Sequence, residues 1–121
     1  MTAFSVTESL IKHISAFGYH TSSRVPKGHP DTFVTVERTG GGAGSYIDHP
    51  VMAIQVWAKS EDEAERAANE LRNALLTSPP PQGIHSIRLE TGPYPFFDDS
   101  TGSARYQMVL DITCQLTIKE N

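Results

Sequence analysis

The chain has 121 residues and a mass of 13.3 kDa, which predicts one domain with a single hydrophobic core. Its formal net charge of -4 argues against binding nucleic acid through phosphate neutralisation. The lone cysteine, Cys114, excludes an internal disulfide framework, and no segment resembles a secretory signal or a membrane span. We therefore expect a single domain, residues 1–121, that is made in the cytoplasm and has neither a membrane partner nor a sequence-specific nucleic-acid partner.

The N-terminal segment predicts a short amphipathic helix. Ser5 followed by Glu8 is a capping-box pattern, in which each residue satisfies a free amide of the first helical turn. Apolar residues then recur near helical spacing at Val6, Leu10, Ile14 and Phe17, until Gly18 ends the segment. Residues 19–31 contain serines, prolines and a glycine, and these favour a surface loop or an irregular strand.

Two runs of β-branched residues, 33–39 and 51–58, predict the strands of a hairpin. Residues 40–50 between them are rich in glycine, so we expect a long, mobile tip that becomes ordered on meeting a neighbour. A phosphate-binding loop is disfavoured there. The glycines are not followed by a Gly-Lys-Ser/Thr ending, and they lie between two strands instead of between a strand and a helix.

Ser60 and Glu63 form a second capping box, which opens an alanine-rich helix that the prolines of residues 78–82 end. A strand at 84–90, a loop at 91–103 and a long alternating strand at 105–118 follow. The last strand carries Cys114 on its apolar face, where a thiol behaves as a small hydrophobic group. This order predicts an α+β domain with a mainly antiparallel four-stranded sheet and two helices packed on one face.

The polar residues show no pattern that is typical of an enzyme, a metal site or a cofactor site. The spacings of the five histidines match no zinc signature, and no Gly-x-Ser-x-Gly nucleophile motif occurs. Asp98 and Asp99, near Glu90, are a potential carboxylate pair, but a solvated loop explains them better. We therefore expect no catalytic residue, no metal and no cofactor.

Two aromatic features have two open explanations each. Phe96 and Phe97 lie in a loop rich in proline and glycine, so they either anchor a subunit contact or pack beside the core. Trp57 shares one side of its strand with Ala53 and Gln55, and this side is opposite the apolar face. Either a second layer covers Trp57 or it belongs to a contact surface.

Taken in order, the elements resemble the tail terminator and neck proteins of long-tailed bacteriophages. The resemblance covers the first helix, the strand ending in 34–41, the strand 50–58, the alanine-rich helix from Ser60, and the closing segment from Asp98 to Tyr106. Its most specific part is the sequence Gln-Val-Trp-Ala-Lys-Ser at residues 55–60. The proline-rich segment 78–82 has no counterpart in this pattern.

The resemblance implies a structural virion protein of a phage or prophage, made in the host bacterial cytoplasm. Such proteins form a ring, usually a hexamer, that caps the tail tube, ends its polymerisation and joins the tail to the head. The implied partners are further copies of the chain, the tail tube protein and the head connector or neck proteins. Candidate subunit-interface residues are Gly40, Gly41, Gly42, Tyr46, Trp57, Phe96, Phe97 and Arg105. The alternatives are another neck, tail-completion or minor tail protein, or a small bacterial ligand-binding or regulatory module.

Overall fold

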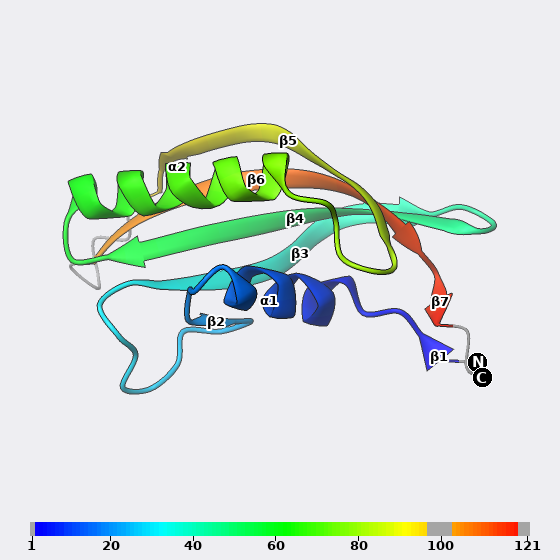
Figure 1. The fold of residues 1–121 in the computed structure, drawn as a ribbon, viewed down its shortest axis with the longest axis horizontal. Coiled ribbons are helices and arrows are strands. Elements are labelled where there is room, and N and C mark those ends of the chain that lie inside the picture. The colour runs from blue at the N-terminus through cyan, green and yellow to red at the C-terminus, as the bar shows by residue number, and fades with distance from the viewer. Residues whose placement is uncertain (1, 97–102, 119–121) are drawn as a thin grey trace.

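A computed structural model describes residues 2–96 and 103–118, and Figure 1 shows its elements. Two helices and seven strands follow each other along this part of the chain. They are β1 (Thr2–Ala3), α1 (Val6–Ala16), β2 (Thr21–Ser22), β3 (Phe33–Ala43), β4 (Ile47–Ala58), α2 (Glu61–Thr77), β5 (Ile84–Pro95), β6 (Ala104–Gln115) and β7 (Thr117–Ile118).

Both helices begin where their capping boxes predict. The Ser5 hydroxyl accepts the Glu8 backbone N–H at 3.2 Å, and the Ser60 hydroxyl accepts the Glu63 N–H at 3.3 Å. Each bond satisfies an amide that has no carbonyl partner within its helix. α2 ends at Thr77, immediately before the proline-rich segment, as proline chemistry requires.

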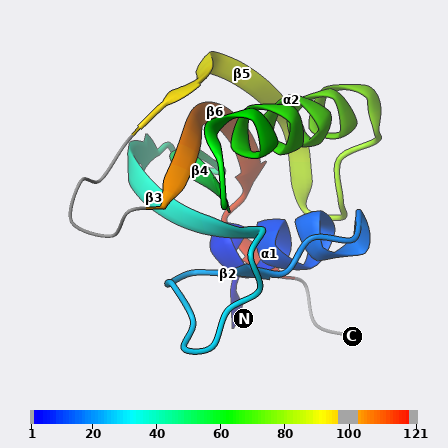
Figure 2. The ribbon, with the colours of Figure 1, turned by 90° about the vertical axis from the view of Figure 1, so that its left-hand side faces the viewer.

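The main sheet has the strand order β2-β3-β4-β6-β5, and Figure 2 shows how strongly it twists. All pairs are antiparallel except β2 with β3, which is parallel. The α+β class is therefore confirmed, but the prediction of a four-stranded sheet was wrong. The sheet has five strands and is mixed, and β1 and β7 form a second, two-stranded sheet. The missed strands have only two residues each, too few for a detectable alternating pattern.

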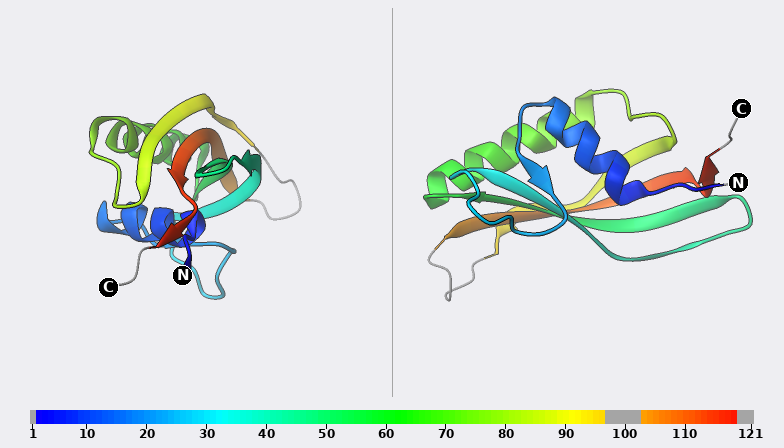
Figure 3. Two further views of the ribbon diagram at one scale, coloured as in Figure 1. Left: turned by 90° about the vertical axis from the view of Figure 1, so that its right-hand side faces the viewer. Right: turned by 90° about the horizontal axis from the view of Figure 1, so that it is seen from below.

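The last strand is shorter than the alternating pattern predicts. β6 ends at Gln115, and β7 turns away to pair with β1, placing Ile118 opposite Thr2 (Figure 3, left). The last residues of the predicted strand 105–118 therefore pair with the N-terminal segment of the same chain. A local alternating pattern cannot distinguish one long strand from two strands with a bend between them.

The glycine-rich tip was also predicted wrongly. β3 continues to Ala43, and Gly40, Gly41 and Gly42 lie opposite Val51, Pro50 and His49 of β4. Only residues 44–46 connect the two strands. Composition suggested mobility, but the continuing backbone ladder with β4 holds the glycines in a strand. β5 likewise extends through the predicted loop to Pro95, because an edge strand tolerates prolines.

Both helices pack on the same face of the sheet, as predicted (Figure 3, right). Apolar side chains from α1, α2 and the inward face of the strands form one core between the helices and the sheet. Its largest fully buried members include Leu10, Ile14, Met52, Ile54, Leu71, Leu75, Met108, Leu110 and Ile112. Cys114 is buried in this core, in agreement with the prediction that it acts as a small hydrophobic residue.

Candidate subunit-contact surface

Within the part of the chain that the structure describes, the second face of the sheet carries no helix, and we call it the helix-free face. An aromatic row crosses it where Phe33 of β3 lies opposite Trp57 of β4, and Trp57 lies opposite Arg105 of β6. The Phe33 and Trp57 rings are stacked, with centroids 5.4 Å apart and planes 9° apart. Trp57 is only 5% exposed although no helix covers it. Its neighbours on the same face therefore bury it.

Arg105 is the main cover of the aromatic row. Its guanidinium carbon lies 4.7 Å from the centre of the Trp57 ring and 4.6 Å from the centre of the Phe96 ring. Its Nε also donates a hydrogen bond of 2.6 Å to the backbone carbonyl of Phe96. Cation–π contact and hydrogen bonding together hold this side chain flat across the end of the sheet. Phe96 remains 40% exposed at the outer edge.

A polar row runs beside the aromatic row, across four strands. Gln55 Nε2 donates to Gln107 Oε1 at 2.8 Å, and Gln107 Nε2 donates to the Tyr94 hydroxyl at 2.6 Å. The buried Thr35 hydroxyl donates to Gln55 Oε1 at 3.4 Å and accepts the Trp57 indole N–H at 3.3 Å. Connected hydrogen bonds of this kind restrict the rotamers of every member.

A groove with a volume of about 420 Å³ lies over the aromatic row and over Thr35 and Gln55 of the polar row. Phe33 and Trp57 lie at its base, and the segment between β2 and β3 borders it through Arg24, Val25 and His29. His29 packs on Phe33 with ring centroids 4.3 Å apart. The groove therefore combines aromatic surface with cationic and polar groups, and its size is in the range of sites that hold side chains or small ligands.

The tip of the β3–β4 hairpin lies at the other end of the sheet. Two hydrogen bonds fix its base, from Arg38 Nη1 to Asp48 Oδ2 at 2.8 Å and from Arg38 Nη2 to Asp48 Oδ1 at 3.0 Å. These bonds lower the pKa of the Asp48 carboxyl group from its ordinary value. Beyond this pair, Tyr46 is 86% exposed. The tip is thus a braced hairpin that presents an aromatic side chain.

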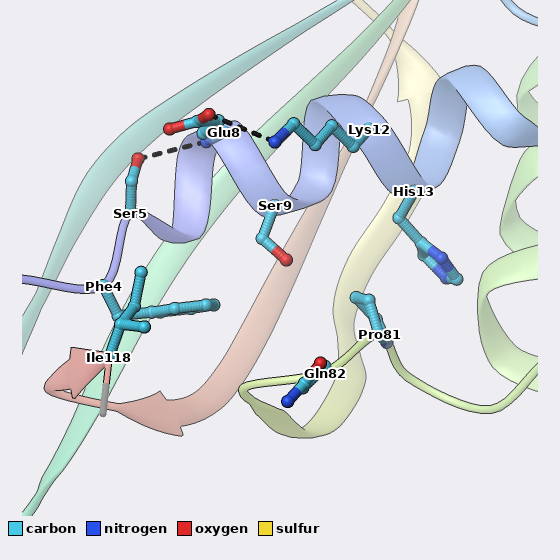
Figure 4. Close-up of a pocket in the computed structure, with 9 residues that line it drawn as sticks. All are labelled: Phe4, Ser5, Glu8, Ser9, Lys12, His13, Pro81, Gln82 and Ile118. Atoms are coloured by element: carbon cyan, nitrogen blue, oxygen red, sulfur yellow. Dashed lines mark hydrogen bonds and ion pairs between the residues drawn. The ribbon is translucent and has the colours of Figure 1, made fainter. Parts of the chain in front are cut away.

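A second groove, of about 470 Å³, lies between the start of α1 and the turn before β5 (Figure 4). Phe4 and Ile118 line its apolar end, while the ion pair of Glu8 with Lys12 lies on its polar side, at 3.3 Å. His13 points from α1 toward Pro81, and its Nε2 is buried without a hydrogen-bond partner in the described part of the chain. Burial lowers the pKa of His13 below its ordinary value of 6.5.

The partly buried imidazole of His13, whose pKa is lowered by burial, predicts acid sensitivity of the fold. Below about pH 6.5 the unfolded chain protonates His13 while the native chain keeps it neutral, so the unfolded state binds more protons. The free energy of unfolding should therefore fall as the pH drops from about 6.5 toward the lower native pKa. His13→Leu should reduce this slope. Urea unfolding from pH 8 to pH 5 measures it, with pH 8, where both proteins are neutral at this site, as the reference. An unchanged slope would contradict the prediction.

The structure brings together three of the predicted interface residues and separates the others. Trp57, Phe96 and Arg105 meet at one end of the helix-free face. Gly40, Gly41, Gly42 and Tyr46 lie in the hairpin at the other end. Phe97, Asp98 and Asp99 lie outside the described residues. Phe33 and Arg105, on the same sheet face, cover the Trp57 ring, and a groove opens beside it. The role of Trp57 in a subunit contact stays a prediction.

Sequence reasoning missed the polar row and the contribution of Phe33. The period-2 pattern of the sequence did contain this information. Phe33 and Thr35 are two residues apart, as are Gln55 and Trp57, so each pair lies on one side of its strand, opposite the apolar positions. Pairing of Gln55 with Gln107 and Tyr94 depends on strand register, which the sequence of a single strand does not contain.

The described residues, 2–96 and 103–118, contain no group of three histidine, cysteine, aspartate or glutamate side chains placed to hold a metal ion. No helix within these ranges is long and apolar enough to cross a membrane. No protein-family model matches the sequence, and comparison with curated proteins finds no match either.

Proposed function

We propose that this protein is a tail terminator of a long-tailed bacteriophage. Copies of the chain form a ring, with six subunits as the expected number, that caps the tail tube and stops its polymerisation. The outer surface of the ring then provides the site where the head connector or neck proteins join the tail. In this proposal the protein acts through assembly, without catalysis or a cofactor. It is made in the bacterial cytoplasm and becomes part of the virion.

The observation that carries the proposal is the presence of two dissimilar exposed features at opposite ends of one sheet. Ile47, next to the tip, and Trp57, beside the groove, are ten residues apart along β4. At about 3.3 Å per residue, they are about 33 Å apart. Closed rings need heterologous contacts, in which one patch of a subunit meets a different patch of the next subunit. A hairpin tip and an aromatic groove are suitable patches of this kind.

The resemblance of the element order to tail terminators also supports the proposal. The segment Gln-Val-Trp-Ala-Lys-Ser at residues 55–60 connects β4 to α2, and it places Trp57 on the helix-free face and Ser60 at the helix start. Phage neck or tail-completion proteins of the same kind are the nearest alternative.

A second candidate function is that of a small ligand-binding or regulatory module. The groove beside Trp57 favours it, since aromatic surface with a few polar groups is typical of ligand sites. Such a module would more commonly form a closed dimer. Oligomeric state therefore separates the two functions.

The test is native mass spectrometry at rising protein concentration, with negative-stain microscopy of the same samples. We expect rings with a central hole and a single subunit number. A closed dimer at every concentration would reject the terminator proposal and favour the binding module. A persistent monomer would call for the same imaging with purified tail tubes, where tube ends without bound protein would reject the proposal.

A further inference from the structure

We infer that the hairpin tip of one subunit docks through Tyr46 into the groove beside Trp57 of the next subunit. This inference rests on the proposed assembly and names the contact that builds it. The occupant is thus a second copy of this chain, and the two surfaces are the braced tip at residues 44–47 and the groove on the helix-free face.

The tip has the properties of an anchor. Tyr46 is 86% exposed and the adjacent Ile47 is 38% exposed. Exposed aromatic side chains held on a rigid element lose little conformational freedom on binding, and tyrosine is among the residues that dominate interface energies. The Arg38–Asp48 pair fixes the base of the hairpin. The glycines before the tip keep that side of the hairpin slim, and within residues 40–47 only Tyr46 and Ile47 have bulky side chains.

The groove has matching chemistry. Phe33 and Trp57 are 2% and 5% exposed, so each offers only a small part of its ring to a phenol ring, and the exposed His29 ring adds further aromatic surface. Arg24 and Arg105 supply guanidinium donors for the phenol hydroxyl group. Among the described residues that line the groove, Glu37 carries the only carboxylate, so this part of the lining is more cationic than anionic. Residues 39–47 contain no charged side chain. The tip therefore brings no cation into a cationic groove, and its hydroxyl and carbonyl oxygens can accept hydrogen bonds there.

The positions of the two surfaces make the contact intermolecular. A tip about 33 Å from the groove, at the opposite end of the same rigid strand, cannot fold back onto it. A neighbour related by rotation about an axis outside the subunit brings the two surfaces together, and repeating that rotation for each further copy closes a ring. The contact is heterologous, so it leaves one free tip and one free groove on every incomplete assembly.

The area of the contact predicts how assembly depends on concentration. One tyrosine buries about 150–250 Å², which is well below the roughly 800 Å² per partner of a stable interface. An isolated pair of subunits is therefore weak. The contact that closes a ring forms within one assembly, so it does not cost the translational freedom of a further subunit. The fraction of protein in rings should therefore rise steeply with concentration, while dimers stay scarce.

The test is disulfide cross-linking between two single-cysteine variants. Both carry Cys114→Ala, which removes the natural thiol. One adds Ser45→Cys beside the tip, and the other adds Val25→Cys in the groove, where Val25 is 50% exposed. Tyr46 is intact in both. Under mild oxidation, the mixture should give a cross-linked dimer in excess of either variant alone. Adding Tyr46→Ala to the tip variant should reduce the yield at least tenfold, and Tyr46→Phe, which keeps the ring, should reduce it less.

The outcomes separate this contact from the proposed function. Rings in the microscope without a mixed cross-link would overturn the docking contact and leave the terminator proposal standing. A mixed cross-link from open chains, with no closed rings, would support the contact and count against the terminator. Efficient cross-linking of the tip variant to itself would show a symmetric tip-to-tip contact and overturn the inference, as would a monomer without any cross-link.

Discussion

Replacing Trp57 by alanine should lower the free energy of unfolding by about 3–5 kcal/mol, as for other large buried aromatic residues. The substitution removes the ring that stacks on Phe33 and lies under the Arg105 guanidinium. It also leaves the buried Thr35 hydroxyl without the indole N–H that donates to it. Urea denaturation followed by circular dichroism measures the change.

Trp57→Phe is the matched control for this substitution. Phenylalanine keeps an aromatic ring against Phe33 but lacks the N–H, so the loss should be clearly smaller than for alanine. A loss under about 1 kcal/mol for Trp57→Ala would mean that the helix-free face contributes little to the native state.

Replacing Gly41 by alanine should destabilise the protein by at least about 1–3 kcal/mol, the typical cost of a strained backbone conformation. Gly41 has a φ of +87°, and an added Cβ would lie 2.0 Å from the carbonyl oxygen of His49 on the paired strand. A backbone atom cannot move away without breaking the ladder between β3 and β4. The hairpin tip should therefore lose its pairing and the assembly contact that depends on it.

Gly42→Ala is the control here, because a Cβ at that position meets nothing within 4 Å and its φ is not in the left-handed region. Its stability and its ring formation should match those of the natural protein. Hydrogen exchange of the amides of residues 38–50 would locate the effect, with faster exchange expected in Gly41→Ala alone. Equal exchange in both variants would contradict the requirement for glycine at position 41.

The elements that could be predicted from sequence are those with a long local signal. The capping boxes at Ser5 and Ser60 placed both helix starts, and the alternating residues of β4 and β6 placed two central strands. The glycine run was predicted to be a mobile tip because glycine content indicates the conformational freedom of an isolated segment. In the fold, Gly40, Gly41 and Gly42 each lie opposite a residue of β4, and pairing removes that freedom.

The groove could be predicted only in part, because it is made by neighbours across the sheet. Trp57 was placed on the correct face from its alternation alone. Its stacking on Phe33 and its cover by Arg105 depend on which residues face each other on three different strands. The contact of Phe96 with Arg105 depends on pairing that continues past the end of β5, where the Phe96 N–H donates to the Arg105 carbonyl at 3.0 Å. Register and long-range pairing are set by the whole sheet, so a local pattern does not contain them.

The pairing of β1 with β7 makes the chain nearly a closed loop. Thr2 lies opposite Ile118, so the two ends of the described chain are neighbours on adjacent strands. A short peptide bridge could join them without disturbing the sheet, which is the arrangement that tolerates circular permutation. New ends could then be opened in the segment between β2 and β3, which would leave both helices and the four long strands continuous. We therefore expect the same architecture to form when the order of the elements along the chain is changed by circular permutation.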